Sequence, residues 1–387
     1  MKAIIGNPAR KEQFYKRPDV RKDILEALSS NENLLISAPR RVGKTSILFN
    51  LIDDPDENIY AVYVNTEGVD DPDYFFYQIL RAILNVDQLE SFGKFSREVK
   101  NLLNEWANRV SDINLGPIGV KVNPIEKKTC FEQLLDFLTK IKLDGKTILL
   151  MVDEFPLTIE HIHAKHGEDI VSLFLDKNRV LRQTPEFNHK IKFIYTGSIG
   201  LFTAVKRINC TDRVNDLKEI RIKQLRKAEA KDFVKNLLND KITNEIDDSI
   251  IEYILSKIEL WIPFYFQLIV KEIAEMVIYE ERELDNQTID LAFEKVVENG
   301  NIYFEHFKSR LLKVFKDSKQ LLFVQQFLIN LQQKESYGRN ETIDLSNKLG
   351  VFDSVEDIID VLKHDGYIVE TDGSFSFYSP ILKKWWR

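Results

Sequence analysis

One stretch that contains glycine and lysine carries the clearest chemistry in this sequence. Residues 38–45 read Ala-Pro-Arg-Arg-Val-Gly-Lys-Thr and stand between an apolar run and a segment with helical apolar spacing. Backbone N–H groups at the start of a helix form a cradle for phosphate. Lys44 can reach the β- and γ-phosphates of a nucleotide, and the Thr45 hydroxyl can bind Mg²⁺. The pattern predicts a Walker A loop with alanine at its first glycine position. Its expected ATP-binding residues are Pro39, Arg40, Arg41, Val42, Gly43, Lys44, Thr45 and Ser46.

A chance Gly-Lys-Thr at a turn is the alternative, and a second motif argues against it. Residues 147–152 are largely apolar without alternation, which is typical of a strand buried on both faces of a parallel sheet. Asp153 and Glu154 follow directly, at the sheet edge where ligands bind in open α/β folds. This pattern predicts a Walker B motif. Asp153 would bind Mg²⁺ together with Thr45. Glu154 would orient or deprotonate the attacking water, and Lys44 is the second expected catalytic residue.

Further strands are needed to position these motifs. Residues 59–65 predict a strand between the two motifs, followed by a helix over 73–84. Residues 191–198 predict a fourth strand ending in small polar residues, and we expect Thr196 and Ser198 to sense the γ-phosphate or the lytic water. Hydroxyl groups that cap a turn are an equally good interpretation of each residue alone.

Two arginines follow this fourth strand. Arg207 and Arg213 precede a fifth strand at 217–222, and an arginine finger that stabilises the transition state is a role open to both. Either residue could serve as the finger, and the sequence does not choose between them.

These motifs resemble those of a known family. The Walker A loop, Asp153-Glu-Phe-Pro and Thr196-Gly-Ser-Ile-Gly-Leu are similar to motifs of the prokaryotic "archaeal ATPase" family, which is grouped with AAA+-like and STAND signalling ATPases. Asn7-Pro-Ala-Arg and Phe14-Tyr-Lys-Arg resemble that family's N-terminal segment, which packs near the adenine. Trp261-Ile-Pro stands where the family has Gly-x-Pro, so no adenine contact is implied there.

The resemblance implies an α/β fold: a P-loop NTPase parallel sheet of the ASCE type, a helical lid, and a C-terminal winged helix. We expect a core over 1–222 with an insert at about 87–127, a lid over 223–300, and a winged-helix domain over 301–387 with a core of its own. The expected lid helices span 227–238, 247–257, 263–279 and 288–298. The expected C-terminal helices span 303–315, 318–333, 343–350 and 354–364, before a hairpin at 366–378.

The expected third helix of the winged helix bears on DNA binding. It carries Glu356, Asp357 and Asp360, and its basic groups are Lys363 and His364. A helix that enters the major groove is expected to be basic, since phosphate neutralisation supplies most of the affinity. We therefore favour a nucleotide-dependent switch or assembly ATPase that contacts a protein partner or a second copy. The alternative is an ATP-dependent DNA-binding regulator, or a mobile-element or defence factor.

Composition agrees with a globular ATPase. The chain has 387 residues, a formal net charge of −7 and 44% hydrophobic residues. A negative net charge gives no global electrostatic reason to bind nucleic acid. Two cysteines and the lack of a long apolar stretch predict a cytoplasmic protein without a membrane segment. We expect Trp385 and Trp386 to belong to the core.

Overall fold

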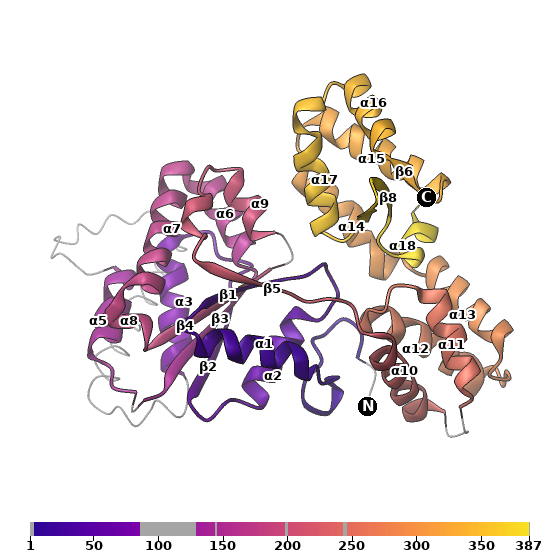
Figure 1. Ribbon diagram of the computed structural model, residues 1–387, viewed down its shortest axis with the longest axis horizontal. Helices are drawn as coiled ribbons and strands as arrows, with labels where there is room; N and C mark the ends of the chain where they lie inside the picture. Colours follow the sequence, from indigo (N-terminus) through magenta and orange to yellow (C-terminus); the bar gives the residue numbers. More distant parts are fainter. Residues whose placement is uncertain (1–3, 86–128, 144, 198–199, 243–245, 387) are drawn as a thin grey trace, which may run out of the picture.

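The computed structural model describes residues 4–85, 129–143, 145–197, 200–242 and 246–386 (Figure 1). The expected insert at 87–127 and the sensor candidate Ser198 lie outside the described residues.

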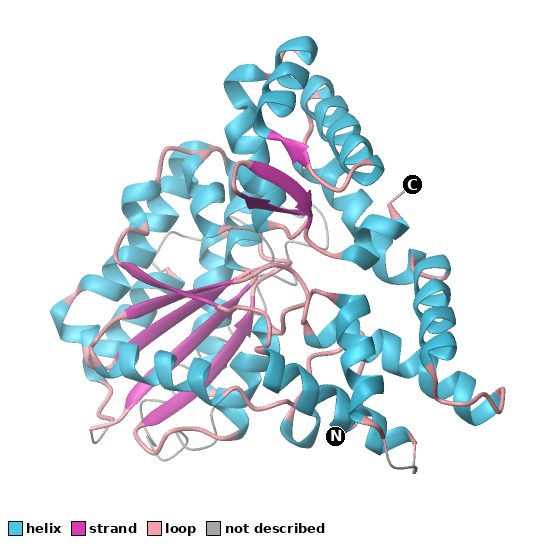
Figure 2. Ribbon diagram, turned by 45° about the vertical axis from the view of Figure 1, so that its right-hand side comes forward, coloured by secondary structure: helices cyan, strands magenta, loops and turns pink. Residues whose placement is uncertain are grey.

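A five-stranded parallel sheet forms the centre of the N-terminal half (Figure 2). Its strands are β1 (Asn33–Ser37), β2 (Ile59–Asn65), β3 (Thr147–Asp153), β4 (Ile191–Thr196) and β5 (Leu217–Arg221), in the spatial order β2-β3-β4-β1-β5. All five strands lie where the sequence predicts them. The strand between the two motifs in sequence, β2, lies at the sheet edge, whereas β4 separates β1 from β3 in space.

Both faces of the sheet are covered by helices, which explains why β3 is apolar at every inner position. Leu149 and Met151 face one cluster of buried side chains, and Ile148, Leu150 and Val152 face the other. The first face is covered by α1 (Pro18–Ser29) and α2 (Lys44–Asp53). The second is covered by α3 (Pro72–Leu84), α5 (Cys130–Lys140), α6 (Phe155–His166), α7 (Glu168–Gln183), α8 (Pro185–Asn188) and α9 (Leu201–Lys206).

Four helices follow β5 and lie beside the sheet, at the lower right in Figure 1. They are α10 (Lys227–Lys241), α11 (Asp248–Ile258), α12 (Pro263–Tyr279) and α13 (Asn286–Glu298), close to the ranges that the sequence predicts. Aspartate side chains begin two of them, because Asp247 accepts from the Ser249 amide and Asp285 from the Thr288 amide. In α12, Pro263 occupies the first position, where a missing N–H costs nothing.

The C-terminal part begins with helix α14 and continues as four further helices with a small sheet. Its elements are α14 (Asn301–Val314), α15 (Ser318–Gln333), β6 (Tyr337–Gly338), α16 (Arg339–Leu349), α17 (Val355–His364), β7 (Ile368–Thr371), β8 (Ser374–Phe377) and α18 (Pro380–Trp385). The hairpin of β7 and β8 is present as expected. The sequence analysis missed β6, which pairs with β8, because two residues show no periodicity.

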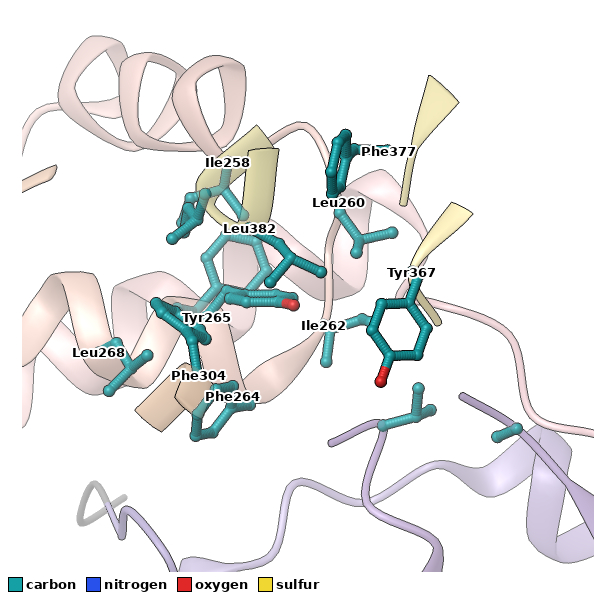
Figure 3. Close-up of a cluster of buried hydrophobic side chains, with 14 of the residues drawn as sticks. Ile258, Leu260, Ile262, Phe264, Tyr265, Leu268, Phe304, Tyr367, Phe377 and Leu382 are labelled. Atoms are coloured by element: carbon teal, nitrogen blue, oxygen red, sulfur yellow. The ribbon is translucent and has the colours of Figure 1, made fainter. Parts of the chain in front are cut away.

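The core of the C-terminal part is continuous with that of the lid helices (Figure 3). Phe304 of α14 lies between Tyr265 of α12 and Trp385, at ring-centroid distances of 6.4 and 5.6 Å. Trp385 and Trp386 are both buried, which confirms their assignment to the core. Among the described residues, the buried side chains of the C-terminal part form one cluster with those of the lid, because α14 and α18 join the two. The domain bounds at 222/223 and 300/301 stay predictions.

Candidate functional site

The phosphate-binding loop is held in a folded conformation by its own residues. Gly43 has a φ of +102°, which a side chain would strain, and it begins α2. The Lys44 ammonium donates to the carbonyl oxygens of Ala38 at 2.7 Å and Pro39 at 3.2 Å. Burial lowers the pKa of Lys44 to about 8. The loop thus places a buried cation at the start of a helix, where an anionic ligand gains most.

Asp153 lies directly across from this loop. Its Oδ2 accepts hydrogen bonds from the Thr45 hydroxyl at 2.8 Å and the Tyr63 hydroxyl at 3.0 Å. Burial raises the pKa of Asp153. The structure therefore brings together Thr45 and Asp153, which the sequence assigned to one metal. Tyr63 was not anticipated, because its apolar neighbours in β2 made it read as a core residue.

Glu154 stands next to Asp153 at the turn from β3 into α6. Its φ of +60° is unusual for a residue with a side chain, and such strain is concentrated at functional sites. Glu154 lines the cavity beside the phosphate loop. A methyl group on Gly197 would lie 2.5 Å from Cδ of Pro156 and 3.6 Å from Oε2 of Glu154. A glycine is therefore required where β4 ends beside this turn.

Of the two sensor candidates, the structure describes Thr196. It ends β4 between the two motif-bearing strands and is fully buried. Its hydroxyl oxygen has no hydrogen-bond partner among the described residues. A buried hydroxyl without a partner is rare. This one lies at the carboxyl end of β4, at the same end of the sheet as Asp153.

A cavity of about 410 Å³ opens in front of the phosphate loop. One wall is the N-terminal segment, which is tied to α2 because the Ala9 amide donates to the Ser46 hydroxyl at 2.9 Å. The other wall comes from α12 and α14. The Arg41 guanidinium lies 4.7 Å from the ring centroid of Phe264, which joins the loop to the lid. The walls outside the loop include Asn7, Phe14, Tyr15, Arg17, Glu67, Phe233, Pro263, Phe264, Gln267 and His306.

The N-terminal segment thus lies at the cavity, as the family resemblance implies. The lid also lines the cavity, since Pro263, Phe264 and Gln267 of α12 form part of its wall. The sequence analysis missed Glu67, Gln267 and His306. No motif marks them. Glu67 follows the end of β2, and Gln267 and His306 lie in the first turns of α12 and α14, which pass beside the cavity.

The two candidate arginine fingers lie elsewhere. Arg207 is 3.7 Å from Glu160, and Arg213 is 3.0 Å from Asp176. Neither is among the described residues that line the cavity. In this arrangement both arginines pair with acids of their own chain.

The C-terminal part touches the phosphate loop directly. A methyl group on Gly366, in the turn after α17, would lie 3.0 Å from Cβ of Pro39 and 3.9 Å from the Arg40 amide nitrogen. Nearby, a methyl group on Gly200 would lie 2.9 Å from the His364 ring. Lys206 of α9 and Asp357 of α17 form an ion pair at 2.6 Å. The acidic helix α17 therefore faces the ATPase core.

The parallel sheet, the phosphate loop and the paired Asp153 and Glu154 define the class of protein: a P-loop ATPase. The chain belongs to the family described as an ATPase domain predominantly from Archaea, whose sequence model matches residues 14–258. No helix among the described residues combines the length and the apolar character that crossing a membrane requires.

Solved structures share this fold. A Walker-type ATPase of Pyrococcus abyssi is similar over 100% of both chains, with 16% identity and a TM-score of 0.62. The ORC2 protein of Aeropyrum pernix, in its ADPNP–ADP complexes, is similar over 98% of this chain and 93% of its own, with 14% identity and a TM-score of 0.55. Identities this low establish the likeness of fold alone. The search of curated proteins found no match.

Proposed function

We propose that the protein binds and hydrolyses ATP at this cavity and uses the cycle as a switch. Lys44 and the backbone amides of the loop would hold the β- and γ-phosphates. Glu154 would accept a proton from the attacking water, and Thr196 would contact the γ-phosphate or that water. The N-terminal segment and the lid would enclose the rest of the nucleotide.

The donor set near Lys44 fits Mg²⁺. The Thr45 hydroxyl and the Asp153 carboxylate are oxygen ligands of the kind that Mg²⁺ prefers, and they already lie 2.8 Å apart. Tyr63 holds the same carboxylate oxygen in place. Mg²⁺ would supply charge neutralisation of the phosphates. The chain would supply the orientation of the carboxylate and the exclusion of solvent from it.

The contact between Gly366 and the phosphate loop carries the switch proposal. Asp365 is buried and accepts from Arg310 Nε at 3.2 Å, and its charge also acts on Arg40 and Lys44. The phosphates of a nucleotide would bring further negative charge to the same cations. The docked position of the C-terminal part would therefore depend on the nucleotide. We propose that this part is a winged helix that contacts a protein partner or a second copy.

The docking of the C-terminal part can be measured without attaching a label. A carbodiimide forms an amide bond between the Lys206 amine and the Asp357 carboxylate when the two side chains are paired. We expect a non-hydrolysable ATP analogue to reduce this cross-link, quantified by peptide mass spectrometry, relative to the protein without nucleotide. In the nucleotide-free protein, we expect Gly366→Ala to lower the yield of this cross-link, because the added methyl group meets Pro39.

Gly373→Ala is the matched control for this experiment. Gly373 has a φ of +74°, close to the +79° of Gly366, but a methyl group there meets no atom within 4 Å. Both variants carry the same backbone strain, about 1–2 kcal/mol. Equal cross-link yields in the two variants would contradict a docking switch. So would a yield in the unmodified protein that does not change when the ATP analogue is added.

DNA binding through α17 is the alternative function, and the structure offers it little support. Asp357 faces Lys206 of the core, and Glu356 pairs with Arg339. We expect the full chain to bind duplex DNA more weakly than ~10⁻⁶ M at physiological salt, as non-specific binders do. Fluorescence anisotropy over a salt series tests this. Sub-micromolar, sequence-dependent binding would make the DNA-binding regulator the better assignment.

A further inference from the structure

His306 occupies an unexpected position for a residue outside the ATPase core. It lies on α14, the helix between the lid and the C-terminal part, and it lines the cavity in front of the phosphate loop. Its ring lies 4.4 Å, centroid to centroid, from the ring of Phe307. The imidazole therefore packs against a neighbour on its own helix.

One nitrogen of this ring remains unused. The Nε2 atom is buried and has no hydrogen-bond partner within the described part of the chain. A buried polar atom of this kind usually finds a partner, either in the protein or in a ligand. Because His306 lines the cavity, a ligand that fills the cavity can supply this partner.

The charges around His306 indicate the chemistry of that partner. Burial, followed by the charges of Arg41 and Arg40, lowers the pKa of His306 to about 4. Two cations of the phosphate loop therefore lie near the neutral ring and disfavour its protonation. An anionic phosphate would remove this penalty, so that the ring could carry a second proton and donate from Nε2. The other charged residues of the cavity wall are Arg17, Lys44, Glu67 and Glu154.

We propose that His306 is a nucleotide-binding residue that donates a hydrogen bond from Nε2 to a phosphate group of the bound nucleotide. This inference rests on the proposed ATP-binding function. It adds a ligand from α14, a helix from which the sequence analysis named no site residue. Arg310, one helical turn further on, pairs with Asp365, so the same helix contacts both the nucleotide and the docked turn.

The test compares three variants of the full chain by isothermal titration calorimetry with ATP and with pyrophosphate. His306→Leu keeps the bulk and removes the donor, and we expect both dissociation constants to rise roughly 10-fold or more, because a charge-assisted hydrogen bond is lost. His306→Gln keeps an N–H donor, and we expect it to recover most of the affinity. Glu305→Gln changes the exposed neighbour on α14 and serves as the control.

The outcomes separate this inference from the proposed function. If the unmodified protein shows no saturable binding of ATP, the proposed function fails before any variant is compared. If the protein binds ATP and His306→Leu behaves like Glu305→Gln, His306 is not a ligand. If His306→Leu weakens ATP but not pyrophosphate, the residue does not contact phosphate. If His306→Gln is as weak as His306→Leu, hydrogen-bond donation is excluded.

Discussion

Replacing Lys44 with methionine is expected to lower the affinity for ATP by at least about 100-fold, the loss that removing charge-assisted hydrogen bonds to phosphate produces. The variant keeps the length of the side chain and removes its charge. In the structure Lys44 is the buried cation of the phosphate loop, bonded to the carbonyl oxygens of Ala38 and Pro39. Calorimetry with ATP measures the effect directly.

Two controls make the result interpretable. Lys22→Met removes an exposed lysine of α1 that pairs only with Glu26 among the described contacts, so it should leave ATP affinity unchanged. A thermal melt of Lys44→Met shows whether the loss of two loop hydrogen bonds unfolds the protein. A folded Lys44→Met protein that binds ATP normally would show that the nucleotide does not occupy this loop.

Replacing Glu154 with glutamine is expected to slow ATP hydrolysis roughly 10²-fold or more while ATP still binds, since the general base is lost but the phosphate cradle is intact. Glu154 lines the cavity at the end of β3, and its backbone amide donates to Asp153 Oδ1 at 3.1 Å. The amide variant preserves size and shape. Single-turnover hydrolysis and a separate binding titration measure the two quantities.

Glu67→Gln is the matched control, because Glu67 is a second carboxylate on the cavity wall. It follows β2, whereas Glu154 follows the strand that carries Asp153. We expect Glu67→Gln to hydrolyse ATP within a few-fold of the unmodified protein. If Glu67→Gln were the slower variant, the role of general base would move to Glu67.

The local sequence determined the parts of the site that depend on consecutive residues. The phosphate loop needs a strand before it, a helix after it, and glycine and lysine at fixed positions, so the loop at 38–45 and its flanking strand and helix were predicted together. The same holds for β3, whose unbroken apolar run reflects burial on both faces of the sheet. Lys44, Thr45, Asp153 and Glu154 meet because the carboxyl ends of parallel strands share one edge.

Residues that reach the site from elsewhere could not be predicted in this way. Tyr63 bonds to Asp153 because β2 and β3 pair in register, with Asn65 opposite Asp153. His306 lines the cavity because α14 passes in front of the loop, about 260 residues further along the chain. No periodicity or spacing within one segment specifies where a distant helix will pass.

The sequence by itself thus determined the five strands, the lid and C-terminal helices before the hairpin, and the residues of the two Walker motifs, since these follow from local patterns of polarity and turn chemistry. Only the tertiary structure decided where the C-terminal part lies. Its helices were predicted as a separate unit, yet Phe304 and Trp385 join it to the lid, and Gly366 rests on Pro39. Apolar faces show that a helix is buried but not against which partner, because hydrophobic burial is non-directional.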